Sequence, residues 1–294
     1  EEEKRANSEF IPELRVAASK ALTRKYVREE FRASRLENIA IGARTEELKD
    51  AAIRALSIKF EDAERVGSLE EALEKSKDLE KTVKEGKTEE RREAASRSLG
   101  IYYLAFNLNE IDGYSLEKLE KMVRENKFQG LREAAATALE SIYPNHYSAD
   151  ELKELIRNSE HELIKRSGAG GLAIRYYSRI SPDISLEELR EIASNPEENV
   201  WLRESAGIAY GELAKGEVNP GELRELARKG ETKEIRKGAG KAWSKALSGS
   251  DRTQAKLERM AGAATGFAPK AYRSAIISAL TDRILAEDMD NGGK

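Results

Sequence analysis

The sequence predicts an all-α fold made of about eight helix-pair repeats, and three patterns indicate it. A bulky residue followed by a basic one recurs along the chain, with small residues three, four and seven positions on and a bulky residue at position eight. These runs start 33 to 43 residues apart. An amphipathic segment with a helix-start signal precedes most of them. A period in this range is typical of stacked repeats, in which each unit buries its apolar face against its neighbours.

The recurring run predicts the second helix of each pair, since positions zero, four, seven and eight lie on one helical face. Small residues at positions three and seven let neighbouring helices approach closely, and the large residue at position eight fills the space between units. The eight runs begin at Leu14, Leu48, Arg91, Leu131, Ile164, Leu202, Ile235 and Tyr272.

The basic residue in second place is present in every unit, including units rich in acidic residues. We therefore interpret it as structural, donating to carbonyls of the preceding turn or to an adjacent carboxylate, and not as a nucleic-acid tract. These residues are Arg15, Lys49, Arg92, Arg132, Lys165, Arg203, Arg236 and Arg273.

Helix-start signals predict the first helix of most pairs. Ser68, Ser148 and Ser185 are each followed three residues later by glutamate, which is the pattern of a capping box. Ser115 is expected to cap a similar helix, and Asn219 offers an N-cap with proline in the first turn. Pairing the helices gives one solenoid over residues 1–286 with a polar tail at 287–294 that we expect to be disordered. Its units lie near 1–26, 27–62, 68–107, 115–145, 148–180, 185–216, 219–248 and 251–286.

The run that opens each second helix resembles that of the HEAT-repeat family, including its bilin-lyase-like branch, and the resemblance covers nearly the whole chain. It implies a right-handed α-α superhelix with the second helices lining the concave side. It also implies that a protein or a nucleic acid binds there. The run is specific for architecture and says little about function.

The composition excludes several chemistries. The 51 basic and 54 acidic residues nearly balance, so no global field draws the chain to nucleic acid. There is no cysteine, which removes thiol nucleophiles and zinc–thiolate sites. No apolar stretch is long enough to predict a membrane span. The absence of cysteine fits a reducing compartment, and we expect a cytoplasmic location. The chain begins with Glu1, so we expect a trimmed N-terminus, and an upstream targeting segment is left open.

No pattern in the sequence predicts a catalytic, cofactor or metal site. Two histidines, His146 and His161, are too few for the di-iron site of HEAT-like hydroxylases. The glycine-rich run from Ser167 to Gly171 falls inside a predicted second helix, and we interpret it as close packing instead of a phosphate loop. We therefore expect no enzyme activity, no cofactor and no small-molecule substrate.

Local charge indicates a candidate partner surface. Residues 224–283 hold 14 basic and 6 acidic residues. Lys237, Lys241 and Lys245 fall four apart and form one stripe that points away from the packing face, and Arg166 and Arg175 extend it in this interpretation. The stripe is either a solvated helix face or a surface that binds an acidic ligand. Tyr102, Tyr177 and Trp201 lie beside the packing positions and, where exposed, are candidate anchors for a partner. The alternative for the two tyrosines is that they cover loop edges. The leading hypothesis is a non-enzymatic scaffold that binds another protein on the concave surface, and the alternative is binding of nucleic acid or another polyanion by the basic C-terminal repeats.

Overall fold

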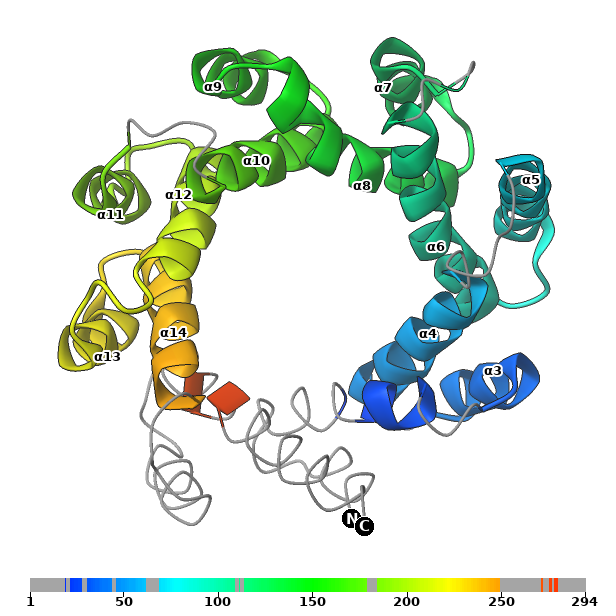
Figure 1. The fold of residues 1–294 in the computed structure, drawn as a ribbon, viewed down its shortest axis with the longest axis horizontal. Helices are drawn as coiled ribbons and strands as arrows, with labels where there is room; N and C mark the ends of the chain where they lie inside the picture. The colour runs from blue at the N-terminus through cyan, green and yellow to red at the C-terminus, as the bar shows by residue number, and fades with distance from the viewer. Residues whose placement is uncertain are drawn as a thin grey trace. The chain divides into compact units, whose positions relative to one another are not determined.

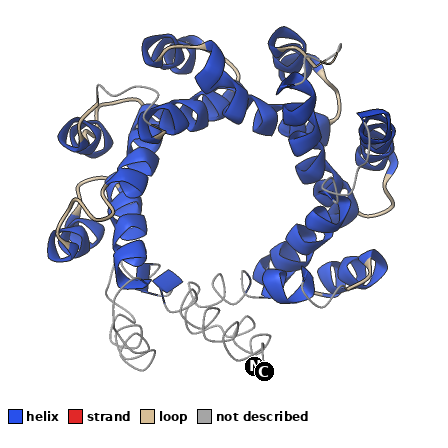
Figure 2. Ribbon diagram, in the orientation of Figure 1, coloured by secondary structure: helices blue, strands red, loops and turns tan. Residues whose placement is uncertain are grey.

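The structure is a computed structural model, and the helices that it describes confirm the all-α prediction. The described residues are 22–27, 31–43, 46–61, 69–108, 111, 114–178 and 184–248, with single positions 19, 271, 275, 276, 278 and 279. These residues form helices and turns, and none of them lies in a β-strand (Figure 2). The predicted unit over 251–286, the tail at 287–294 and most of the unit at 1–26 lie outside the described ranges.

The described chain falls into two compact units that meet inside one helix, between Leu172 and Ala173. Each unit is a succession of helix pairs, which we call A and B in chain order (Figure 1). Whether both units continue one solenoid over residues 1–286 stays a prediction.

The N-terminal unit, Leu22–Leu172, has its B helices packed in series. Helix α4 contacts α6 and α6 contacts α8, while α3 packs on α4, α5 on α6 and α7 on α8. Its A helices are α3 (Ala33–Gly42), α5 (Leu69–Glu85), α7 (Leu116–Glu125) and α9 (Ala149–Asn158). Its B helices are α4 (Glu46–Glu61), α6 (Glu89–Leu108), α8 (Gln129–His146) and the first part of α10 (Glu162–Tyr177).

The C-terminal unit, from Ala173 onward, repeats this arrangement, with α12 packed on α14. Helix α11 covers α12 and α13 covers α14. The bounds are α11 (Leu186–Ser194), α12 (Val200–Leu213), α13 (Pro220–Lys229) and α14 (Lys233–Ser248).

The core contains the small and large positions of the recurring run, as predicted. Position eight is fully buried in every described B helix, at Leu56, Leu99, Leu139, Leu172, Tyr210 and Trp243. The small residues at positions three and seven are also buried, from Ala51 and Ala55 in α4 to Ala242 in α14. A hydrogen bond between two B helices shows that these small residues face the neighbouring helix. Ser98 Oγ donates to the carbonyl of Ser57 at 2.8 Å.

Close backbone approach explains the glycines of the C-terminal unit. A Cβ added to Gly207 on α12 would lie 2.7 Å from the carbonyl oxygen of Glu234, and one added to Gly238 on α14 would overlap the carbonyl oxygen of Gly207. Gly207 and Gly238 therefore mark a close helix contact, because no larger side chain fits without moving backbone. The close packing predicted for the Ser167–Gly171 run is also observed, since a Cβ added to Gly171 would lie 3.0 Å from the Cβ of Tyr143.

The second-place basic residues have the structural role predicted for them. Four arginines donate Nη1 to a carbonyl just after the end of the preceding A helix. Such a carbonyl has no hydrogen-bond partner within the helix. The bonds run from Arg92 to Gly86 at 2.7 Å, Arg132 to Asn126 at 2.8 Å, Arg203 to Pro196 at 2.6 Å and Arg236 to Gly230 at 2.6 Å. Lys49 pairs with Glu90 at 3.0 Å, and Lys165 pairs with Glu162 at 3.4 Å. All six described members therefore bind structural acceptors within the fold.

The predicted helix starts are also observed. Ser148 and Ser185 each form a complete capping box, and the Ser115 side chain accepts from the backbone N–H of Lys118. Asn219 caps α13, with Pro220 as the first helical residue. Ser68 lies outside the described residues.

Candidate functional site

The side of the B helices that faces away from the A helices is the candidate surface, and we call it the B face. Run positions two, six and ten occupy it, because they lie about one turn apart and avoid the packing positions. In the N-terminal unit this face comes from α4, α6 and α8 (Figure 1).

The first part of the B face is a neutral charge network across α4 and α6. Arg54 Nε lies 2.8 Å from Asp50 Oδ2 in α4. Arg97 Nη2 on α6 lies 3.0 Å from Asp50 Oδ1 and 2.8 Å from Glu93 Oε1. Two carboxylates thus balance two guanidinium groups, and this network carries no net charge.

Beside this network lies an exposed apolar group, which we call the α4–α6 patch: Ile58, Ile101, Ala105 and Leu108. Ile58 is 40% exposed, Ile101 is 43% exposed and Leu108 is 61% exposed. Both isoleucines hold run position ten, on helices that the Ser57–Ser98 hydrogen bond joins. Ile101, Ala105 and Leu108 follow one another along a single face of α6. The sequence analysis missed this patch, although two isoleucines at the same run position of consecutive units were a usable signal.

The lysine stripe lies on the B face of the C-terminal unit, and a carboxylate on the neighbouring helix partly neutralises it. Lys241 Nζ lies 2.6 Å from Glu212 Oε1, and Lys245 bonds the other oxygen of the same carboxylate. Burial raises the pKa of Glu212, but the bonds from Lys241 and Lys245 outweigh it and hold that pKa below its usual range. Lys237 and Lys241 are exposed and Lys245 is half-buried. The stripe therefore has a smaller net charge than its sequence indicated.

The expectation of an exposed Tyr102 is wrong. Tyr102 is only 3% exposed, and its ring lies 6.0 Å from that of Phe106, centroid to centroid. Tyr102 holds run position eleven, which follows position seven by one helical turn and so shares the packing face. That spacing could have revealed its burial.

The other predicted anchors are at least partly accessible. Tyr177, Arg175 and Trp201 are half-buried, and Arg166 is exposed. Asn199 caps α12 by accepting from the backbone N–H of Trp201 at 2.9 Å, which places the indole in the first helical turn. Arg166 belongs to the N-terminal unit, so its continuity with the lysine stripe stays a prediction.

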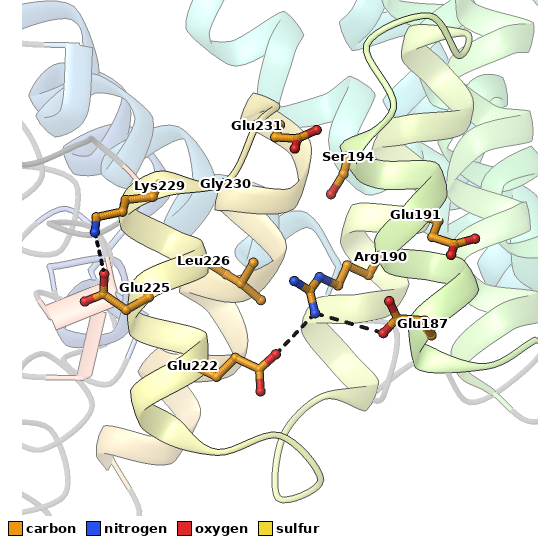
Figure 3. Close-up of a pocket in the computed structure, with 10 residues that line it drawn as sticks. All are labelled: Glu187, Arg190, Glu191, Ser194, Glu222, Glu225, Leu226, Lys229, Gly230 and Glu231. Atoms are coloured by element: carbon orange, nitrogen blue, oxygen red, sulfur yellow. Dashed lines mark hydrogen bonds and ion pairs between the residues drawn. The ribbon is translucent and has the colours of Figure 1, made fainter.

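A groove of about 430 Å³ lies between the A helices α11 and α13, and the sequence analysis did not anticipate it (Figure 3). Five glutamates line it against two basic residues. Arg190 Nη1 bridges the helices, 3.2 Å from Glu222 and 4.0 Å from Glu187. Lys229 Nζ lies 3.3 Å from Glu225, and this bond holds the pKa of that carboxyl below its usual range.

Among the residues that the structure describes, no His, Cys, Asp and Glu side chains gather in a group of three or more suited to a metal ion. No helix in the same ranges combines the length and apolar character needed to cross a bilayer.

The chain matches no known family, no curated protein and no solved structure. The resemblance to HEAT repeats therefore stays a prediction drawn from the recurring run.

Proposed function

We propose that this protein is a non-enzymatic scaffold of the HEAT-like kind, a right-handed α-solenoid that binds another protein on its concave side. In this proposal the B helices line the concave side, and the B face is the contact surface. The observation that carries the proposal is a pair of exposed isoleucines, Ile58 and Ile101, at the same run position of the successive B helices α4 and α6. Contiguous exposed apolar side chains with charged neighbours are typical of protein-binding surfaces.

The energetics favour a protein as the ligand of this surface. Complete burial of an isoleucine contributes about 1.5–3 kcal/mol, so covering the part still exposed would contribute roughly 1 kcal/mol for each of Ile58 and Ile101. A nucleic acid would gain little from these side chains. The neighbouring arginines Arg54 and Arg97 are already paired with carboxylates, which weakens their attraction for phosphate.

Affinity capture from the native extract tests the proposal. The bait is the full chain, either unchanged, with Ile101→Asp, or with Thr137→Asp. Thr137 is an exposed B-face residue on α8, so its substitution makes the same charge change outside the patch. We expect one or more proteins that survive nuclease treatment to bind the unchanged and Thr137→Asp chains and to be lost with Ile101→Asp. Identical capture by all three baits would refute the role of this surface.

The second candidate is polyanion binding by the lysine stripe, because Lys237 and Lys241 remain exposed on the B face. A gel-shift titration with duplex DNA at two salt concentrations tests it. Phosphate contacts would make the affinity fall steeply with salt. If no complex forms at low salt, the stripe does not bind nucleic acid.

A further inference from the structure

We propose that the α4–α6 patch receives one α-helix of the partner, which crosses α4 and α6 and presents two apolar side chains seven residues apart. This inference rests on the proposed function, because it names the partner element that fits the same surface. The spacing of the isoleucines and the charges beside them support it independently.

The spacing favours a helix over a strand. Packed helices lie about 8–10 Å apart, so equivalent positions on α4 and α6 recur at roughly that interval. Residues i and i+7 of a helix lie about 10.5 Å apart on nearly the same face. Same-face residues of a strand lie about 6.7 Å or 13 Å apart, and both values are further from the middle of that interval than the helical spacing is. A helix that lies across the two B helices can therefore place one apolar side chain against Ile58 and the next against Ile101.

The exposed end of α6 extends the contact. Leu108 is the most exposed of the large apolar residues described, at 61%, and it lies two turns beyond Ile101 on the same face. The patch is therefore longer along α6 than along α4. A helix with its side chains is about 10–12 Å wide, so the flank of the partner helix would cover Ala105, on the Leu108 side of the contact.

The arginines beside the patch keep N–H donors for acceptors on the partner helix, although their network with Asp50 and Glu93 carries no net charge. Arg54 and Arg97 come one turn before Ile58 and Ile101, so basic side chains border the patch on both helices. Their side chains are 47% and 36% exposed. The described ion pairs use Nε of Arg54 and Nη2 of Arg97, and a guanidinium has five N–H donors in all. Asp50 and Glu93 hold the two arginines in place, and carboxylates of the partner can accept from their remaining donors. The partner element is thus an amphipathic helix with hydrogen-bond acceptors, such as glutamate side chains, along one edge of its apolar stripe.

Synthetic peptides of about eighteen residues test this inference with the full chain. The first peptide is alanine-based and helical, with two leucines seven residues apart and glutamates along one edge of the leucine stripe. The second has the same composition, with its leucines five residues apart and so on different faces of the helix. Fluorescence anisotropy measures the binding of each labelled peptide.

We expect the first peptide to bind and the second to bind at least about ten-fold more weakly. Ile101→Asp should weaken the first complex by about ten-fold or more, and Thr137→Asp should leave it unchanged. Ile58→Ser, which removes apolar contact without adding charge, should weaken it in the same direction and serves if Ile101→Asp does not fold. Failure of the first peptide to bind, equal binding of both peptides, or binding that ignores both isoleucine substitutions would overturn the inference. If the peptides fail while capture from the extract still depends on Ile101, the proposed function stands and the partner element is not a helix.

Discussion

The contact between α12 and α14 allows a test in which two physical effects have opposite signs. Gly238→Ala replaces a mid-helix glycine of α14, and helix propensity alone predicts stabilisation of about 1 kcal/mol. The added Cβ, however, would overlap the carbonyl oxygen of Gly207 and lie 3.1 Å from its carbonyl carbon. The obstacle is backbone of a packed helix, so α12 and α14 must move apart. Overpacking of this kind costs about 1–3 kcal/mol and occasionally more. Because the overlapped atom belongs to backbone, the upper part of that range applies, about 2–3 kcal/mol, and we expect a net loss of about 1–2 kcal/mol.

Urea unfolding followed by circular dichroism measures this loss as a lower midpoint with an unchanged slope. Gly42→Ala is the matched control, because Gly42 is also helical and a Cβ there would meet nothing within 4 Å. Gly42→Ala should be neutral or slightly stabilising, since only the propensity effect acts on it. If Gly238→Ala is as stable as the unchanged chain, helix propensity outweighs the crowding, and the close approach of α12 and α14 is not as the structure has it.

Three further predictions follow from individual bonds. Arg132→Gln removes the guanidinium that donates to the carbonyl after the end of α7. We expect the free energy of unfolding, measured with urea, to fall by about 1 kcal/mol. An unchanged urea midpoint would contradict this capping role. Glu212→Gln removes the carboxylate that pairs with Lys241 and Lys245, so the affinity for duplex DNA at low salt should rise and should depend more steeply on salt. Glu204→Gln, on the same helix, is the control. Equal effects of the two substitutions would contradict a specific neutralisation of the lysines by Glu212. Burial, with the nearby Glu120 carboxylate, raises the pKa of Tyr143 above its value in the unfolded chain, so its contribution to stability is complete below about pH 10 and is lost as the pH rises further. Tyr143→Phe should therefore lose less stability than the unchanged chain between about pH 9 and 11, and parallel losses would contradict the assignment.

The sequence was sufficient where one residue type recurs for one physical reason. Small residues at positions three and seven, a large residue at position eight and a basic residue in second place repeat in every unit. One structural argument therefore covers each of these positions. The capping boxes at Ser148 and Ser185 are local motifs that depend on residues three positions apart, and local motifs can be recognised without knowing the fold.

The candidate surfaces were harder to predict, because they depend on how neighbouring helices align. The lysine stripe is visible in α14 alone, but its neutralisation requires Glu212 of α12 to lie beside it, and that register comes from tertiary packing. The groove between α11 and α13 likewise depends on two A helices far apart in sequence. Tyr102 is a different case, since four-residue spacing from position seven already indicated the packing face.

The two observations on the B face together favour one class of ligand over the other. A surface that attracts a polyanion needs uncompensated positive charge, yet Glu212 holds two lysines of the stripe, and Asp50 and Glu93 hold the arginines of α4 and α6. A surface that binds a protein benefits from such internal pairing, because fixed, partly satisfied charges cost less to desolvate and still discriminate between partners. The exposed isoleucines then supply the favourable contact that the paired charges do not. In the N-terminal unit, the paired charges and the exposed isoleucines together therefore favour a protein ligand over a phosphate backbone.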